Sequence, residues 1–365
     1  MPSVISNHRE WATLDLIRAA GVGRLDPIIR DFLEGGSGSE VTLRRNVAMF
    51  DTIGFAPAVM SGRAFPSLST TFLGIDLALP ILTAPFGADR LFHDDGQKAV
   101  VRAAQQFGLA SIAPEASSFS LEDLSTAAPR AAVLGQFHPM GSEQNFVTML
   151  HRYEAAGYRA LCLTLDCPTP GWREHNLRND YVITEDVVGG NYPAGSEGAM
   201  HEALGQLYLH DEPIWSWAQL GALMSETSLP WIAKGVLTSL DARRAIEAGA
   251  SAVYVSNHGG RQLDGVPSSI ESLPAIAQEL AGEFPILLDS GIRRGSDIVK
   301  AISLGATAVV IGRLAAYGLA ADGQPGVERV FDLLKRELQT VLQLLGRGDI
   351  SELTPDAVIR LGGIA

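Results

Sequence analysis

The sequence predicts an α/β barrel, because two patterns alternate along the chain from about residue 79. Eight short apolar runs recur, and segments with the apolar spacing of helices separate them. Gly108, Gly157, Gly249 and Gly305 each end a helix-like segment just before the next run, as glycine commonly does. This number of strands predicts a TIM (β/α)8 barrel. The predicted strands are Ile81–Ala84, Ala110–Ala113, Ala131–Leu134, Ala160–Leu165, Trp231–Ala233, Ala252–Val255, Ile286–Leu288 and Ala308–Ile311.

Helical periodicity also precedes and follows the barrel. Residues 8–35 show one apolar face and predict an N-terminal helical extension that ends at a glycine-rich turn, residues 35–38. Residues 51–78 are irregular with short strand-like pieces, and Gly326–Leu345 predicts a helix on the outside of the barrel. The other predicted helices are Thr42–Phe50, Gly96–Phe107, Glu143–Ala156, Leu240–Ala248, Ser269–Ala281 and Ser296–Leu304.

Composition limits the classes of function. The 365 residues are 46% hydrophobic and carry a formal net charge of −13, which argues against nucleic acid or an anionic membrane as a partner. No apolar run is long enough to span a bilayer, and the N-terminus lacks the pattern of a signal peptide. The two cysteines, Cys162 and Cys167, match no zinc motif and no disulfide framework. We therefore expect a cytoplasmic protein without a metal site.

The barrel is expected to be one domain that covers residues 1–365, with its core at about 79–320. The connection after the fourth strand, residues 175–230, is too long for an ordinary barrel loop. It follows a strand at the catalytic end of such a barrel, so we predict a lid, with a mobile surface insertion as the alternative.

Glycine and arginine follow the seventh and eighth predicted strands. The seventh strand ends in Asp289-Ser290-Gly291-Ile292-Arg293, and the eighth ends in Gly312-Arg313. Glycine-rich turns after these two strands commonly bind phosphate in α/β barrels. Each pair alone is a weak signal, but together they predict a phosphorylated cofactor or substrate.

The other strand ends carry residues suited to proton transfer and carboxylate binding. His258 can act as a base, and Asp166 is placed to pair with it and raise its pKa. Arg173 and Arg261 offer two planar groups for a substrate carboxylate. Lys234 could be a Schiff-base amine, a phosphate partner or a surface lysine. Together these residues predict proton abstraction from a small acid beside a phosphate-bearing cofactor.

At this point the chain resembles the FMN-dependent α-hydroxy acid oxidases and dehydrogenases. The run SNHGGRQLD, which begins at Ser256, is similar to the active-site signature of that family. The segments KGVLTSLDARRAIEAGA and DSGIRRGSDIVKAISLGATAVVIGR are similar to it throughout. FLEGGSGSEVTLRRN near the N-terminus also matches, so the resemblance covers essentially the whole chain.

The resemblance implies FMN as cofactor and oxidation of a 2-hydroxy acid to a 2-oxo acid, with oxygen or another electron acceptor. It implies that His258 is the catalytic base, Asp166 its partner, and Arg173 and Arg261 the ligands of the substrate carboxylate. It also implies a homo-oligomer, commonly a tetramer. The implied FMN ligands are Gln136, Thr164 and Ser256 at the ring, Lys234 at N1 and the C2 carbonyl, Asp289 at the ribityl chain, and Gly291, Arg293, Gly312 and Arg313 at the phosphate.

The chain departs from the family pattern around the substrate. Phe32 and His138 stand where many members carry tyrosine, and Phe86 stands where a small polar residue is common. The second strand ends in Ala113-Pro114-Glu115-Ala116, without the usual serines. We therefore predict a substrate bulkier than glycolate or lactate. His138 is a candidate substrate ligand, with a structural histidine as the alternative.

Two other interpretations stay open. Another phosphate-binding barrel, such as an inosinate-dehydrogenase-like enzyme, requires a catalytic cysteine; Cys167 is the candidate and lacks a glycine-rich setting. The chain could also be an FMN-binding barrel of the same family with diverged or lost hydroxy-acid oxidation. The altered tyrosine positions favour that interpretation, and the retained His258 and Lys234 argue against it.

Overall fold

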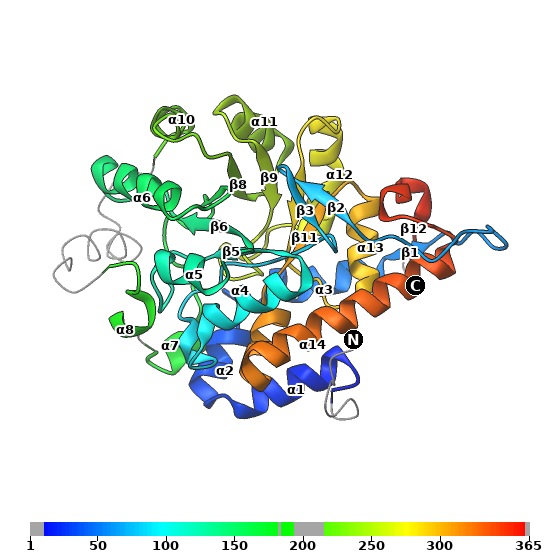
Figure 1. Cartoon of the computed structure of the whole chain (residues 1–365), viewed down its shortest axis with the longest axis horizontal. Helices are drawn as coiled ribbons and strands as arrows, with labels where there is room; N and C mark the ends of the chain where they lie inside the picture. The colour runs from blue at the N-terminus through cyan, green and yellow to red at the C-terminus, as the bar shows by residue number, and fades with distance from the viewer. Residues whose placement is uncertain (1–10, 182–183, 193–214, 362–365) are drawn as a thin grey trace.

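The computed structural model describes residues 11–181, 184–192 and 215–361. Eight parallel strands form a closed barrel in chain order, and helices surround it (Figure 1). The pairing of β11 with β4 closes the barrel, with Val309 opposite Ile81. All eight predicted strands are confirmed. They are β4 (Ile81–Thr83), β5 (Ala110–Ala113), β6 (Ala132–Phe137), β7 (Leu161–Thr164), β8 (Trp231–Val236), β9 (Ala252–Val255), β10 (Ile286–Leu288) and β11 (Ala308–Ile311).

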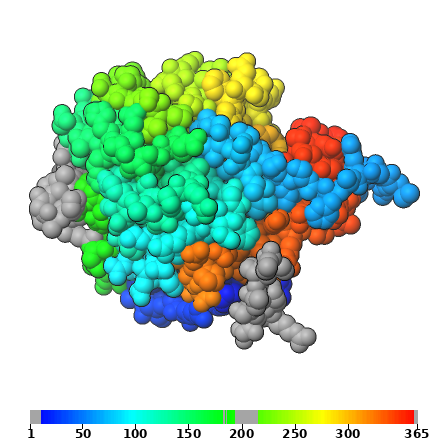
Figure 2. All heavy atoms as spheres, in the orientation of Figure 1, coloured from blue at the N-terminus to red at the C-terminus, as the bar shows by residue number. Residues whose placement is uncertain are grey.

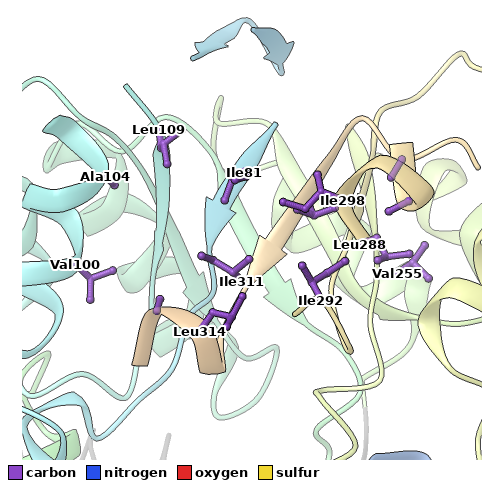
Figure 3. Close-up of a cluster of buried hydrophobic side chains, with 14 of the residues drawn as sticks. Ile81, Val100, Ala104, Leu109, Val255, Leu288, Ile292, Ile298, Ile311 and Leu314 are labelled. Atoms are coloured by element: carbon purple, nitrogen blue, oxygen red, sulfur yellow. The ribbon is translucent and has the colours of Figure 1, made fainter. Parts of the chain in front are cut away.

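Two apolar layers hold the barrel together, because successive side chains of a strand point to opposite faces. One layer fills the interior and includes Leu82, Ile112 and Val310. The other lies between the strands and the helices and includes Ile81 and Ile311 (Figure 3). The hairpin of β2 (Thr70–Phe72) and β3 (Ile75–Leu77) packs on the interior layer and leads directly into β4. It therefore covers the N-terminal end of the barrel and leaves the C-terminal end for chemistry.

Helices cover the barrel between the strands. The predicted helices that alternate with the strands are found within a residue or two of their expected bounds. Where the sequence predicts left-handed glycine at the helix ends, Gly108 has φ 64° and Gly157 has φ 77°. The helices of the barrel region are α4 (Gly96–Phe107), α5 (Leu121–Ala127), α6 (Glu143–Ala155), α10 (Trp217–Met224), α11 (Ser239–Glu247), α12 (Ser269–Leu280) and α13 (Gly295–Ser303), with the short η1 (Asp89–Leu91).

The N-terminal extension differs from the prediction of one helix over residues 8–35. It forms α1 (Leu14–Arg24) and α2 (Pro27–Glu34), and residues 8–10 lie outside the described part. The break has a local cause, since Asp26 caps α2 by accepting a hydrogen bond from Ile28 N at 2.8 Å and Pro27 occupies its first turn. The predicted helix at 42–50 is confirmed as α3 (Val41–Asp51).

The C-terminal helix α14 (Arg313–Leu345) is kinked at Asp322 and Gly323, where the backbone leaves helical geometry. It packs against α1, α4 and α13 on the outside of the barrel, as predicted for residues 326–345 (Figure 1). The chain then forms η2 (Ile350–Glu352), η3 (Pro355–Ala357) and β12 (Val358–Arg360), which pairs with β1 (Ile53–Phe55). The segment between β1 and β2 stands out from the rest of the surface (Figure 2).

The long connection after β7 is described in part. It contains α7 (Glu174–Arg178) and α8 (Glu185–Val188), and α10 lies near its end. Residues 182–183 and 193–214, which are part of the predicted lid, lie outside the described residues. Within the described part of the chain, no helix is long and apolar enough to cross a membrane.

Candidate active site

The C-terminal ends of the barrel strands bring the predicted site residues to one rim, because all eight strands are parallel. The C-terminal parts of β6, β7 and β8 contain Gln136, Thr164 and Lys234, respectively. Asp166 follows β7, and His258 follows β9. The same rim receives Ser256 after β9, Asp289 and Gly291 after β10, and Gly312 and Arg313 after β11. In this class of barrel the rim is where catalysis takes place.

His258 lies between an acid and a cation. Its Nδ1 is 3.3 Å from Asp166 Oδ1 and 3.3 Å from Lys234 Nζ. Lys234 and Asp166 also form a buried ion pair at 3.6 Å. The backbone of His258 has φ 59°, a left-handed conformation that costs about 1–3 kcal/mol for a residue other than glycine. The surrounding structure therefore holds the backbone of His258 in this conformation at some cost in stability.

The pKa of His258 differs from the sequence prediction. Burial and the charge of Lys234 lower it to about 4, although Asp166 acts in the opposite direction. Asp166 does raise the pKa of His258 as predicted, but this increase is smaller than the decrease caused by burial and Lys234. Burial would raise the pKa of Asp166, but Lys234 and His258 hold it below its usual range. At neutral pH the imidazole is therefore neutral, which is the form that accepts a proton.

Arg261 directly follows Gly259 and Gly260, and Arg173 lies beside it. Arg261 Nη1 donates to Phe32 O at 2.6 Å and to Gly35 O at 3.0 Å, and its guanidinium lies over the Phe32 ring. Arg173 Nε donates to Arg261 O at 3.2 Å. Burial, with the charges of Arg173 and Arg313, lowers the pKa of Arg261 well below its usual value. Like charges held together in this way favour binding of an anion.

Arg313 holds both Gly259, next to His258, and the end of α2 in place. Its Nη1 donates to Gly259 O at 2.9 Å, and its Nε donates to Leu33 O at 3.0 Å. Burial and the nearby charge of Arg293 lower the pKa of Arg313 to about 10. Gly291 has φ 108°, and a side chain there would collide with the carbonyl of Asn46. Packing and backbone conformation therefore account for the glycine at this position.

These residues fit FMN by their chemistry. The closely placed cations Arg293 and Arg313 suit a phosphate, because a bound dianion would offset their mutual repulsion. Lys234 is 3% exposed, and Asp166 and Asp289 outweigh burial and raise its pKa, so it is a fixed cation at the rim. Among the described residues, no group of three or more His, Cys, Asp or Glu side chains is placed to hold a metal ion.

The predicted ring and ribityl ligands are held by one another. Gln136 Nε2 donates to Thr164 Oγ1 at 3.0 Å, and Ser256 Oγ accepts from the backbone N of His258 at 3.1 Å. Burial raises the pKa of Asp289, whose carboxylate accepts a hydrogen bond from Tyr254 at 2.8 Å. The rim therefore presents oriented polar groups on rigid strands.

An aromatic cluster adjoins Arg261, and sequence reasoning identified only part of it. Phe32 stacks on Phe92 with ring centroids 6.3 Å apart and meets Tyr181 at 5.2 Å. Phe86 meets the edge of Phe92 at 5.9 Å. Phe92 and Tyr181 lie in irregular segments, where no periodicity identifies which residues face a site.

Glu115 is a further residue whose importance the sequence did not show. Its Oε2 is 2.9 Å from His138 Nδ1, and its Oε1 accepts a hydrogen bond from Tyr192 at 2.8 Å. Cys167 lies near enough to contribute, with Glu115, to the raised pKa of His138. The structure thus places His138 at the rim in a buried polar cluster, which agrees with its alternative interpretation as a structural histidine.

Comparison with known protein families supports FMN as the cofactor. Residues 22–360 match the family described as FMN-dependent dehydrogenase. A peroxisomal (S)-2-hydroxy-acid oxidase of Oryza sativa subsp. japonica is 37% identical over 337 residues, which are 91% of this chain and 91% of the relative. An L-lactate oxidase of Lysinibacillus sphaericus is 36% identical and covers 91% of this chain and 89% of its own length.

Solved structures show the same similarity. A lactate oxidase of Pediococcus acidilactici superposes with a TM-score of 0.88 at 34% identity and covers 96% of this chain and 95% of its own. A mandelate oxidase with bound (S)-2-phenylpropionate gives a TM-score of 0.86 at 33% identity and covers 96% and 99%. A mandelate oxidase variant that holds a C4a-hydroxy-FMN adduct gives 0.85 at 34% identity and covers 95% and 99%.

Proposed function

Since the chain belongs to the FMN-dependent α-hydroxy acid oxidase family, we propose that it oxidises a 2-hydroxy acid bulkier than glycolate or lactate to the 2-oxo acid. FMN supplies the two-electron acceptor when it is bound. The observation that carries the choice of substrate is the cluster of Phe32, Phe86 and Phe92 beside Arg261. Aromatic side chains bind apolar groups and rings better than they bind a small polar acid.

His258 is the proposed base. Its Nδ1 faces Asp166, so when Nδ1–H donates to Asp166 Oδ1 the lone pair lies on Nε2. Nε2 accepts the proton of the substrate hydroxyl, and Asp166 stabilises the imidazolium that forms. Lys234 neutralises Asp166 in the resting protein and would hold the flavin at N1 and the C2 carbonyl.

Arg173 and Arg261 are the proposed ligands of the substrate carboxylate. Arg261 is already oriented by the carbonyls of Phe32 and Gly35, so little of its rotational freedom is lost when a carboxylate binds. Arg173 Nε donates to the backbone carbonyl of Arg261 itself. We therefore propose that the substrate binds with its carboxylate at the arginines and its side chain toward the aromatic cluster.

The test is an anaerobic panel in which flavin bleaching is followed for glycolate, L-lactate, mandelate and 3-phenyllactate. We expect the aromatic acids to reduce the flavin fastest. Fastest reduction by glycolate would contradict the proposed substrate class while leaving hydroxy-acid oxidation intact. Protein that is yellow but bleached by no hydroxy acid would support the alternative of lost oxidation.

We also propose a homotetramer located in the cytoplasm, with oxygen or another acceptor reoxidising the flavin. Some plant relatives are named peroxisomal, and fractionation of the cells that make the protein tests the location. Light scattering of the FMN-loaded protein tests the oligomeric state. Oxygen uptake during turnover tests the acceptor.

A further inference from the structure

The run that begins at Ser256 contains a buried side chain to which the proposed reaction gives no role. Gln262 directly follows Arg261, a proposed carboxylate ligand, and is 7% exposed. It lies in the loop after β9, whereas its hydrogen-bond partners lie in the loop after β7. A glutamine amide has an acceptor oxygen and a nitrogen with two donor hydrogens, so one buried amide can join several groups. Gln262 is therefore placed to set the two loops against each other.

The nitrogen of the Gln262 amide holds the loop after β7 by its carbonyls. Nε2 donates to Asp166 O at 3.0 Å and to Thr169 O at 2.9 Å. The two donor hydrogens of the amide are thus used. Asp166 is also the residue whose Oδ1 lies 3.3 Å from His258 Nδ1. The amide therefore fixes the backbone that carries the partner of the proposed base.

The oxygen of the same amide holds the far end of that loop. Oε1 accepts from Gly171 N at 3.0 Å and from Arg173 Nη2 at 3.3 Å. Arg173 Nε donates to the adjacent carbonyl, Arg261 O, at 3.2 Å. Nε and Nη2 lie on one edge of the planar guanidinium, so two hydrogen bonds on this edge set its plane and its direction. Arg173 is thereby oriented by two consecutive residues of the loop after β9.

Gly171 shows independently that the two loops lie in close contact. A Cβ atom at this position would collide with Arg261 O and would lie 2.8 Å from Gln262 Cα. Both contacts are closer than a Cβ atom tolerates, so a larger residue would force the loops apart. The glycine thus permits the approach at which the Gln262 amide reaches its partners.

We propose that Gln262 is a positioning residue that orients Arg173 for the carboxylate of the substrate by tying the loop after β7 to the loop after β9. This inference rests on the proposed function, in which Arg173 binds that carboxylate. A guanidinium whose fork is already aligned loses less rotational freedom when a carboxylate binds. Loss of the Gln262 amide therefore weakens the binding of acids, while a ligand without a carboxylate is affected little.

The experiment measures binding without turnover in the full-length, FMN-loaded protein. Phenylacetate has the carboxylate of an aromatic 2-hydroxy acid but no hydroxyl group to oxidise, and phenylacetamide is its uncharged counterpart. Each is titrated while the flavin absorbance is followed. Gln262→Met keeps the size of the side chain and removes the amide; we expect it to raise the Kd of phenylacetate about tenfold and that of phenylacetamide less than about twofold. Gln343→Met is the matched control, because Gln343 is exposed on α14.

A double variant shows whether Gln262 acts through Arg173. If it does, Gln262→Met combined with Arg173→Lys weakens phenylacetate binding no more than Arg173→Lys alone, because the oriented guanidinium is already lost. Additive losses overturn the proposal. So does an unchanged Kd for phenylacetate in Gln262→Met, or an equal loss for the acid and the amide.

Two further comparisons separate this proposal from a folding defect and from the proposed function. Melting temperature and FMN content establish that Gln262→Met is folded. If it does not fold, Gln262→Glu replaces it; its charge offsets that of Arg173, so the Kd of phenylacetate alone should rise, and an unchanged Kd overturns the proposal. Wild-type protein that binds the acid no better than the amide contradicts the carboxylate site and the proposed function with it. A preference for the acid that persists in the Gln262 variants overturns only the role of Gln262.

Discussion

Lys234 Nζ lies 3.3 Å from His258 Nδ1, so the proposed base has a permanent cation as its neighbour. Burial and this contact together make protonation of the imidazole unfavourable, and the pKa of His258 falls to about 4. Asp166 contacts both groups and limits this effect. The base therefore stays in its proton-accepting form over a wide pH range at some expense of basicity.

The acid limb of the pH profile should report this lowered pKa. His258 is neutral above about pH 4, whereas an ordinary histidine becomes protonated below 6.5. We expect kcat/KM to stay constant as the pH falls through 6.5 and to decline only at clearly lower values. The measurement is kcat/KM against pH, with bound flavin monitored at each point. A midpoint at or above 6.5 contradicts the role of Lys234.

Replacing Asp166 by asparagine removes the charge that stabilises the imidazolium. The rate of flavin reduction should fall by about 10²–10⁴-fold, the range expected when proton transfer is impaired. Stopped-flow reduction under anaerobic conditions measures this rate directly. Asp76→Asn is the control, because Asp76 is exposed on the hairpin at the other end of the barrel. Equal losses in both variants would indicate a general effect on folding.

A carboxylate-binding role for Arg173 predicts a substrate-dependent defect. Arg173→Lys should weaken transition-state binding of a 2-hydroxy acid by about 1.5–3 kcal/mol, the range for a hydrogen bond to a charged group. The corresponding 2-hydroxy amide has no carboxylate and should be affected much less. Comparing kcat/KM for the acid and the amide in both proteins checks this. Equal losses for the two substrates would place Arg173 outside the carboxylate site.

The aromatic cluster should determine the preferred substrate size. Phe86→Ala removes the edge contact with Phe92, and we expect kcat/KM for an aromatic hydroxy acid to fall about 10–200-fold. The value for glycolate should change little, because a two-carbon acid does not reach the rings. Phe65→Ala, at an exposed position between β1 and β2, is the matched control. Parallel losses on both substrates would argue against a role in specificity.

Much of this arrangement was predictable because local patterns fix it. Parallel strands bring their C-terminal ends to one rim, so His258, Asp166 and Lys234 could be placed together from the sequence. The break between α1 and α2 was also readable, since Asp26 before Pro27 is a helix-start signal that the apolar periodicity obscured. Here the wrong prediction came from giving periodicity more weight than capping.

Other features depend on contacts that no local pattern encodes. Tyr192 and Glu115 are 77 residues apart, and Tyr192 lies in a connection without periodicity. The pKa of His258 depends on the balance of burial against two opposite charges, which requires distances. The sequence showed that His138 departs from the family pattern, but it did not show that His138 contacts Glu115. These features follow from distances in the folded chain, so sequence patterns could not predict them.

The Glu115–His138 pair should make stability depend on pH. The pKa of His138 is about 10 in the folded protein and 6.5 in the unfolded chain, so its contribution is complete below 6.5 and is lost as the pH rises toward 10. We expect urea denaturation to show that His138→Gln lowers the free energy of unfolding below pH 6.5 and that this difference shrinks near pH 10. His151→Gln should show no such dependence. A constant difference for His138→Gln would mean that the imidazole is neutral in the folded protein.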